Sequence, residues 1–475
     1  MCGVIGVYGQ IKMQDVGKML GYLTHRGQDA SGIAWIEKNE LSIIKDNVYP
    51  SKLTLPERIV PVVIGSTRYP TFGVRISSEA PIERFAQPFS FPTSKGEVAT
   101  VHNGQLVNLM ELAEGEEYLS DSELICRLLS EKLNENENYP DAINELMDLM
   151  DGSYSEICII NTLPHPTMLV FRDPLGIRPL IMGKVNETYL FASESIVIEQ
   201  MGGEIIRDIN PGELIVIQKI EDEVILKEYQ LQEQPAKHCM FEYVYFASPS
   251  STIDERSVYD VRTKLGERLA AEILKRGIDI DYVVPVPDSS RIAAQKTAEL
   301  VDKPFREAIL KNRYYTSRTF ILNSSSERKK ALESKYIYVS SLIKGKKLLV
   351  IDDSIVRGKT SQKIIDKLRS FGAEKIIFAS TCPPLIRPCY YGIDMALDSQ
   401  FIARNKSLNE LQEVLEVELI IYQGIGDLFE AINRRDLCTA CITGEYPTNA
   451  GKRIRKLLNE GKIDPEKPHY EQLTS

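Results

Sequence analysis

The chain is poor in histidine. Its 475 residues include only five histidines, which are His25, His102, His165, His238 and His469. A serine–histidine–aspartate enzyme needs a histidine base beside its nucleophile, and a polyhistidine metal site needs several imidazoles together. The sequence offers little material for either class of site.

Long apolar runs and an excess of positive charge are also lacking. No segment approaches the ~20 uninterrupted apolar residues that span a bilayer, and the amino-terminal MCGVIGVYGQ has no basic region typical of a signal peptide. The formal net charge of −10 argues against a nucleic-acid partner, although a local site for phosphorylated metabolites remains open. We therefore expect a soluble, cytoplasmic protein with no nucleic-acid or membrane partner.

The pattern of apolar residues predicts two domains and a tail. Residues 1–232 contain many short strand-like runs with a few helical stretches, which indicates a layered α+β domain. Residues 233–445 alternate between strands and helices in the manner of a parallel sheet with crossover helices. Residues 228–240 are polar and contain a proline, so we expect a linker there. Residues 446–475 form a charged tail with some helix.

The run KKLLVIDDSIVRGKTSQKI carries the most specific local signal. A buried-type strand ends in Asp352 and Asp353, whose carboxylates can accept hydrogen bonds from ribose hydroxyls or approach a magnesium ion. Gly358 permits close backbone approach, and Thr360 and Ser361 open a helix whose amides can bind a phosphate. The alternative is a plain strand–loop–helix joint with a solvated acid pair.

This run resembles the signature of the type I phosphoribosyltransferases, and VVPVPDSSRIAA at 283–294 resembles their pyrophosphate-side loop. On its own the PDSS turn would usually be a helix cap. The resemblance implies one Mg²⁺ per subunit, held with the help of Ser290, Asp352 and Asp353. The positions that it assigns to phosphoribosyl pyrophosphate are Asp352, Asp353, Arg357, Gly358, Lys359, Thr360, Ser361, Lys311 and Arg318.

The segment KNRYYTSRTFI, residues 311–321, resembles a flexible loop that closes over the substrate in one branch of these enzymes. By that resemblance, Lys311, Arg313 and Arg318 would neutralise the pyrophosphate leaving group. The alternative is a basic surface stretch.

Cys2 stands next to the initiator methionine. Removal of Met1 would leave Cys2 with a free α-amino group, which titrates near pH 8 and can serve as base for its own thiol. No histidine partner is then needed. The alternative is a small apolar residue that begins a strand.

Four further segments occur in the order seen in class II glutamine amidotransferases: HRGQDASG (25–32), GSTRYPTFG (65–73), VHNGQLVN (101–108) and SDSE (120–123). The resemblance makes Cys2 the nucleophile that hydrolyses glutamine. It implies that Arg68 holds the α-carboxylate of glutamine and Asp121 its α-amino group. Asn103 and the Gly104 amide would form the oxyanion hole, and Arg26 would support the site.

Both halves together, over about residues 1–445, resemble the glutamine phosphoribosylpyrophosphate amidotransferases. The resemblance implies an αββα sandwich of the Ntn-hydrolase type, followed by an α/β phosphoribosyltransferase domain. The expected reaction hydrolyses glutamine and transfers the ammonia to phosphoribosyl pyrophosphate, which gives 5-phosphoribosylamine in the first step of purine synthesis. A homotetramer and inhibition by purine nucleotides are further expectations.

The eight cysteines do not suggest a disulfide framework, because we expect a reducing compartment. By resemblance, the thiolates of a [4Fe–4S] cluster come from Cys239, Cys389, Cys438 and Cys441. Four thiolates also suit zinc, and unliganded thiols are a third possibility. Cys126 and Cys158 lie in apolar runs and are expected in the core.

Four departures from the family bear on function. Ser66 replaces a histidine, Ser248 an arginine, and Glu333 an arginine, while residues 314–317 lack a hinge glycine. An acidic residue near a polyphosphate ligand weakens binding by charge repulsion. The alternative hypothesis is therefore a diverged paralogue that acts as a glutaminase or as a regulatory partner, with impaired phosphoribosyl transfer.

Overall fold

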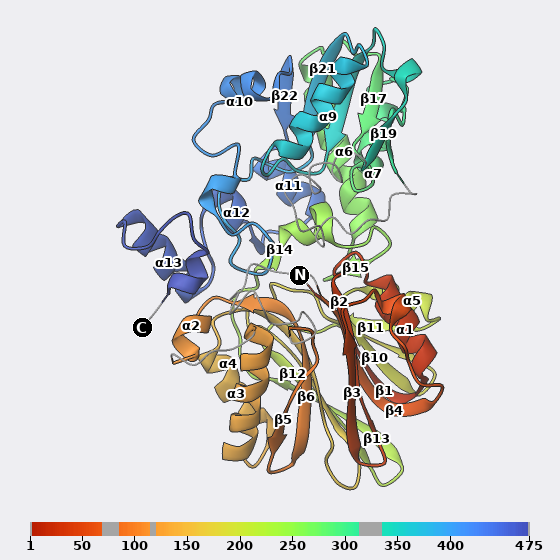
Figure 1. The fold of residues 1–475 in the computed structure, drawn as a ribbon, viewed down its shortest axis with the longest axis vertical. Helices are drawn as coiled ribbons and strands as arrows, with labels where there is room; N and C mark the ends of the chain where they lie inside the picture. The colour runs from red at the N-terminus through yellow and green to blue at the C-terminus, as the bar shows by residue number, and fades with distance from the viewer. Residues whose placement is uncertain (1, 69–84, 115–119, 313–334, 474–475) are drawn as a thin grey trace.

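The structure, a computed structural model, describes residues 2–68, 85–114, 120–312 and 335–473. The chain forms two halves stacked along its long axis, with the amino-terminal half at the bottom of Figure 1 and the carboxyl-terminal half at the top. Within the described ranges, no helix combines the length and the apolar character needed to cross a membrane.

The amino-terminal half consists of two antiparallel sheets between two layers of helices. The first sheet has the strand order β11-β9-β10-β1-β4-β2-β3 and the second has β13-β12-β8-β7-β6-β5. The strands are β1 (Gly3–Lys12), β2 (Ala30–Glu37), β3 (Glu40–Asp46), β4 (Ile59–Arg68), β5 (Phe89–Thr93), β6 (Gly96–Leu106), β7 (Gly152–Ile160), β8 (Thr167–Arg172), β9 (Ile181–Val185), β10 (Thr188–Ala192), β11 (Glu204–Asp208), β12 (Glu213–Ile220) and β13 (Glu223–Gln230).

Successive side chains of each strand point to opposite faces of its sheet, so each sheet packs against two layers. One face of each sheet contributes to a core between the sheets, with Val4, Ile64 and Ile157 fully buried or nearly so. The outer faces are covered by helices (Figure 1). These are α1 (Met13–Tyr22) and α5 (Ser195–Gln200) on the first sheet, and α2 (Leu109–Leu112), α3 (Asp121–Glu135) and α4 (Tyr139–Leu149) on the second. The expected αββα sandwich is confirmed.

The carboxyl-terminal half is built on a four-stranded parallel sheet in the order β17-β20-β21-β22. Helices cover both faces, which explains the unbroken apolar runs in its strands. The sheet contains β17 (Tyr282–Pro285), β20 (Lys347–Asp352), β21 (Lys375–Ser380) and β22 (Leu419–Tyr422), and the helices of this half are α6 (Val258–Lys275), α7 (Arg291–Leu300), α9 (Lys359–Ser370), α10 (Leu408–Leu415), α11 (Ile425–Ile432) and α12 (Ala440–Thr443).

Short two-stranded pairings complete this half. They are β14 (His238–Cys239) with β23 (Leu437–Cys438), β15 (Thr252–Ile253) with β16 (Arg256–Ser257), and β18 (Ile309–Lys311) with β19 (Tyr336–Tyr338). The first pairing revises the expected linker at 228–240. Its end is not a solvated connection, because His238 and Cys239 are buried in a parallel pair with β23.

The tail is part of the fold rather than a free appendage. Its helix α13 (Asn449–Asn459) begins where the Ala450 N–H donates to Asp151 Oδ2 in the amino-terminal half at 2.7 Å. The Tyr446 ring stacks on Tyr390 with centroids 4.2 Å apart, and the Tyr390 hydroxyl lies 2.9 Å from His469 Nδ1. The tail therefore ties both halves together.

We expect Tyr446→Ala to lower the melting temperature markedly, because truncating a buried aromatic side chain typically costs about 3–5 kcal/mol. Tyr446→Phe keeps the stack and loses only the hydrogen bond from the hydroxyl to Pro388 O, so its effect should be smaller, about 1 kcal/mol. Thermal unfolding of the two variants measures the difference. Equal melting temperatures for wild type and Tyr446→Ala would contradict a structural tail.

Candidate active site

Cys2 lies immediately before β1, at the end of the first sheet that faces the upper half. It is half-buried, whereas the other seven cysteines are buried. Its carbonyl oxygen accepts a hydrogen bond from Arg26 Nε at 3.3 Å. Arg68 ends β4 nearby: burial lowers the pKa of its guanidinium, while negative charge on Cys2, Asp29 and Asp121 opposes that effect. Arg68 is thus placed to bind an anionic group near the thiol.

Asn103 and Gly104 lie on β6. Asn103 is fully buried, yet neither its amide nitrogen nor its amide oxygen has a hydrogen-bond partner among the described residues. Buried polar groups are nearly always paired, so an unpaired amide is suited to a ligand. A Cβ on Gly104 would lie 1.9 Å from Ser153 O, so this position requires glycine.

Asp121 is the first residue of α3. Its Oδ1 accepts the Ser122 N–H at 2.9 Å, and its Oδ2 accepts the Leu106 N–H at 3.3 Å. These bonds fix the carboxylate between the helix terminus and β6. The structure therefore brings both Cys2 and Asp121 within electrostatic range of Arg68.

A buried network of charges supports this end of the sandwich. Arg26 Nη1 lies 2.5 Å from Glu194 Oε1, and Arg26 Nη2 lies 2.7 Å from Glu242 Oε1. Arg178 Nη1 reaches the same Glu242 oxygen at 3.2 Å. All four side chains are at most 1% exposed. Burial acts to raise the pKa of Glu194, but the charges of His25 and Arg26 outweigh it and lower that pKa.

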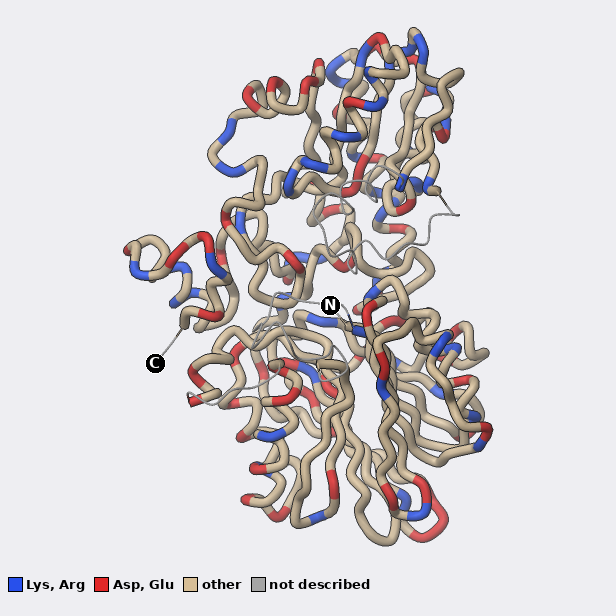
Figure 2. The backbone as a smooth tube through the Cα atoms, viewed as in Figure 1, with Lys and Arg blue, Asp and Glu red and all other residues tan. Residues whose placement is uncertain are grey.

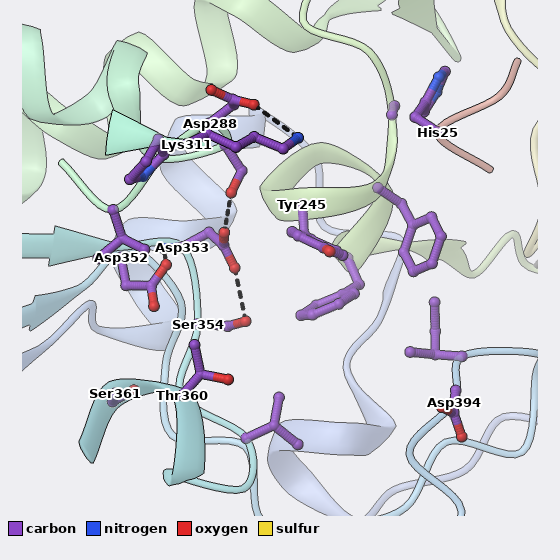
Figure 3. A pocket seen from close by; sticks show the side chains of 18 of the residues that line it. His25, Tyr245, Asp288, Lys311, Asp352, Asp353, Ser354, Thr360, Ser361 and Asp394 are labelled. Atoms are coloured by element: carbon purple, nitrogen blue, oxygen red, sulfur yellow. Dashed lines mark hydrogen bonds and ion pairs between the residues drawn. The ribbon is translucent and has the colours of Figure 1, made fainter. Parts of the chain in front are cut away.

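A cavity of about 740 Å³ opens at the carboxyl end of the parallel sheet. Its walls include Asp352 and Asp353 from the end of β20, and Figure 3 shows His25 at the opposite side. Since His25 belongs to the amino-terminal half, both halves contribute to this cavity. The remaining predicted residues that line it are Arg357, Gly358, Thr360, Ser361 and Lys311.

The acid pair is buried and electrostatically strained. Burial raises the pKa of Asp352 well above its ordinary value, and the neighbouring Asp353 raises it further. Burial also raises the pKa of Asp353, against the hydrogen bonds that it accepts from Ser289 and Ser354. A cation bound beside such a pair would lower both pKa values. Burial lowers the pKa of the Lys335 ammonium, while the charge of Asp352 opposes that effect.

The loop after β20 has the geometry of an anion site. Gly358 has φ of +69°, and a Cβ there would lie 2.3 Å from Ile402 Cδ1. It immediately precedes α9, whose first turn carries Thr360 and Ser361. Lys359 is exposed and does not line the cavity. Lys311 Nζ lies 3.1 Å from Asp288 Oδ2 (Figure 3), whereas Arg318 lies outside the described residues.

Two side chains in this region, Ser289 and Arg262, were not assigned to the site from the sequence. Ser289, rather than Ser290, donates a hydrogen bond to Asp353, since the Ser290 hydroxyl donates to Val286 O at 2.5 Å. Arg262 donates to the carbonyls of Tyr243, Tyr245 and Ala247, and so holds the π-helix at Glu242–Phe246 beside the cavity. Arg262 carried no signal, because it occurs in an ordinary charged helix.

The four cysteines assigned to a cluster are each 8–9% exposed. Cys239 and Cys438 are opposite each other in the β14–β23 pair, and Cys441 lies one turn further on. Cys389 lies close enough to this group to act on Cys441. Burial raises the pKa of Cys441, and the charge of Cys389 raises it further. Among the residues that the structure describes, no three histidine, cysteine, aspartate or glutamate side chains are placed to hold a single metal ion.

Two of the departures fall on described residues. The Ser66 hydroxyl is buried without a hydrogen-bond partner in the described part of the chain. Ser248 lines the cavity, and its N–H donates to Glu194 Oε2 at 2.8 Å. Residues 314–317, Arg313 and Glu333 lie outside the described residues.

Comparison with known proteins matches both halves. A glutamine amidotransferase domain model matches residues 74–200, and a phosphoribosyl transferase domain model matches residues 258–398. The chain is 38% identical over 469 residues to the amidophosphoribosyltransferase of Methanothermobacter thermautotrophicus, covering 94% of each chain. It is 36% identical over 463 residues to that of Escherichia coli, covering 91% of this chain and 88% of the relative.

The solved structures agree. The glutamine phosphoribosylpyrophosphate amidotransferase from B. subtilis, solved in complex with ADP and GMP, superposes with a TM-score of 0.82 at 30% identity, and covers 94% of this chain and 98% of that one. A structure described as the allosteric regulatory enzyme of purine biosynthesis gives a TM-score of 0.83 at 29% identity and covers 99% of both chains.

We expect Glu194 to stabilise the fold at neutral pH and to lose this effect in acid. Because its folded pKa lies below its ordinary value, its contribution is present above the unfolded pKa of about 4.3 and is lost as the pH falls below that value. Glu194→Gln should melt at a lower temperature than wild type at pH 7, with a gap that narrows between about pH 5 and 3. Glu199→Gln, at an exposed position on α5, is the control. A constant gap across this range would contradict the assignment.

Proposed function

The chain belongs to the amidophosphoribosyltransferase family, and we propose that Cys2 releases ammonia from glutamine for use at the acid pair of the second half. The family's reaction is the transfer of that ammonia to phosphoribosyl pyrophosphate in purine biosynthesis. The observation that supports these residue assignments is the cavity, which is lined by residues of both halves. His25 in the cavity wall contacts Glu194, Glu194 pairs with Arg26, and Arg26 donates a hydrogen bond to the carbonyl of Cys2. The cavity is thus connected to the nucleophile by three consecutive contacts.

Glutamine hydrolysis begins with the thiol of Cys2. After removal of Met1, the α-amine of Cys2 accepts the thiol proton, and the thiolate attacks the amide carbon of glutamine. Arg68 binds the α-carboxylate and Asp121 the α-amino group. The unpaired amide of Asn103, with the Gly104 N–H, stabilises the oxyanion. The C–N bond then breaks, ammonia leaves with the proton from the α-amine, and water hydrolyses the thioester to glutamate.

Transfer takes place in the cavity. Ammonia attacks the anomeric carbon of phosphoribosyl pyrophosphate, and the bond to pyrophosphate breaks as that group leaves. In this proposal Asp352 and Asp353, which line the cavity, bind the ribose hydroxyls, and the loop from Arg357 to Ser361 binds the 5′-phosphate. Keeping ammonia out of bulk water preserves its nucleophilicity, because protonation would remove the lone pair.

A magnesium ion fits the acid pair. A cation would offset the raised pKa values of the two buried carboxylates, and Mg²⁺ typically takes one or two carboxylates while water and substrate phosphates supply the remaining ligands. Asp352 and Asp353 would hold it. The hydroxyl beside the pair is that of Ser289, because the predicted Ser290 donates to Val286 O. The ion would supply charge neutralisation for the departing pyrophosphate.

The four buried thiols fit a [4Fe–4S] cluster in a structural role. Such a cluster binds each thiolate to a different iron, so its ligands stand further apart than those of one zinc ion. Cys239, Cys389, Cys438 and Cys441 would hold it between the tail and the two halves. The proposal also includes purine nucleotides as regulators, since the B. subtilis relative was solved with ADP and GMP. It further includes a homotetramer, which the family resemblance suggests.

We expect Cys2→Ala to abolish glutamine-dependent release of pyrophosphate from phosphoribosyl pyrophosphate. The same variant should keep its ammonium-dependent rate, because that reaction bypasses the thiol. Pyrophosphate release with each nitrogen source measures both rates in wild type and variant.

A glutamine-dependent rate that persists in Cys2→Ala would overturn the role of the thiol. Glutamate release by wild type without phosphoribosylamine formation would instead favour a glutaminase with an impaired second site. Cys126→Ala, which truncates a buried core thiol, serves as the control for a cysteine outside the site.

Anaerobically purified protein should contain about four iron and four sulfide per chain. Cys438→Ser should lose most of both, together with thermal stability, because the cluster joins the tail to the two halves. Cys158→Ser, at a buried thiol in β7, should keep the iron. One zinc per chain without sulfide would contradict the cluster.

A further inference from the structure

Gln87 stands out as a polar residue at the Cys2 site that the proposed mechanism does not use. Its side chain is only 4% exposed. Its Nε2 lies 3.0 Å from His102 O, 2.9 Å from Ser122 Oγ and 3.9 Å from Cys2 Sγ. One carboxamide therefore touches the nucleophile, the strand of the oxyanion hole and the helix that carries Asp121.

The orientation of this carboxamide is fixed by the backbone of His102. Gln87 Oε1 accepts the His102 N–H, while Nε2 donates to the carbonyl of the same residue. Exchanging the two ends of the amide would set donor against donor and acceptor against acceptor. One N–H of Gln87 is thus committed to the His102 carbonyl, and the other is shared between Ser122 Oγ at 2.9 Å and Cys2 Sγ at 3.9 Å.

The register of the second sheet explains why a side chain is needed here. The pairing of β5 with β6 begins with Phe89 opposite Thr100. If this antiparallel ladder continued two residues further back along the chain, Gln87 would lie opposite His102. Pro88 has no N–H to donate to that ladder. The Gln87 side chain supplies the missing donor and acceptor, and so continues the pairing of β6 up to the residue before Asn103.

The segment that carries Gln87 is itself clamped. Lys45 Nζ donates to Ala86 O at 3.0 Å and to Pro88 O at 3.2 Å, on either side of Gln87. A Cβ on Gly32 would lie 2.0 Å from Gln87 O, so the close packing of this segment on β2 depends on a glycine. These contacts limit the freedom of the carboxamide before any substrate binds.

From this arrangement we infer that Gln87 is a positioning residue for glutamine hydrolysis, which sets the Cys2 thiol against the amide of Asn103. Its second Nε2–H, which Ser122 Oγ shares, also donates to the thiolate and favours the attacking form. Its hydrogen bonds to His102 hold the neighbouring Asn103 in position. No proton is transferred to or from Gln87. The inference rests on the proposed glutaminase function of Cys2.

The test compares Gln87→Leu, Gln87→Glu and the matched control Gln218→Leu, which removes a carboxamide that donates to Thr167 Oγ1 on β8. Three quantities are measured on the full chain: glutamate release, ammonium-dependent pyrophosphate release, and alkylation of Cys2 by iodoacetamide followed by mass spectrometry. Cys2 is suited to this reagent because the other cysteines are buried.

For Gln87→Leu we expect kcat for glutamate release to fall about 10- to 100-fold. This is less than the ~10²- to 10³-fold loss typical of removing an oxyanion-hole donor, because Gln87 Nε2 lies 3.9 Å from the sulfur and shares its hydrogen with Ser122. KM for glutamine should change less than about threefold, because Arg68 and Asp121 remain. Alkylation should slow by about fivefold. Gln87→Glu should lose more, since its carboxylate faces the His102 carbonyl and the thiolate. The ammonium-dependent rate should stay within about twofold for all variants, and Gln218→Leu should resemble wild type.

Unchanged glutamate release and alkylation in Gln87→Leu would overturn the inference. An equal loss of the ammonium-dependent rate would also overturn it, because Gln87 would then have a general structural role. If wild type releases no glutamate but alkylation of Cys2 still depends on Gln87, the glutaminase function fails while the hold of Gln87 on the thiol stands.

Discussion

The structure depends most on the buried ionic network of Arg26, Glu194, Glu242 and Arg178. Removing charges from water is costly, so such a group is stable only when every member is paired. Here each carboxylate meets at least one guanidinium, at distances of 2.5–3.2 Å. Arg26 also donates to the carbonyl of Cys2, and Arg178 donates to Tyr391 O. The nucleophile and the four-cysteine region are therefore fixed to the same set of charges.

This network also places the two halves relative to each other. Glu242 begins the π-helix at Glu242–Phe246, which lies beside the cavity of the second half, while Arg26 and Glu194 belong to the first half. Arg262 fixes that π-helix by donating to two carbonyls within it and to the carbonyl of Ala247, which follows it. Figure 2 shows that acidic and basic residues are interspersed along the chain in both halves. The buried pairs at the junction differ from these because solvent cannot screen them.

Most elements could be predicted from the sequence, because their periodicity reflects burial on one face or both. A few helical stretches were expected within residues 1–232, and the structure has among them α3 at Asp121–Glu135 and α4 at Tyr139–Leu149. The strand before Asp352 was equally clear. The tail was expected to hold some helix, and α13 lies there, but its packing on the rest of the fold was not predicted. The helix buries little more than Ala450, Gly451 and Ile454, and its charged face gave no sign of the Tyr446 stack. The predicted linker at 228–240 was wrong at its end for the same reason. Two buried residues in a short parallel pair are too few to show a periodic pattern of apolar residues.

The sequence alone determined the chemistry that each segment offers: a thiol after the initiator methionine, an acid pair at a strand end, and hydroxyls and a glycine before a helix. Local patterns carry such information because a motif needs only its own neighbours to form. Tertiary structure alone decided which side chains meet. Gln87 reaches Cys2, His102 and Ser122 across 85, 15 and 35 residues, and Ser289 rather than Ser290 reaches Asp353. Contacts of this kind depend on strand register and on the packing of the two halves, which no local pattern in the sequence encodes.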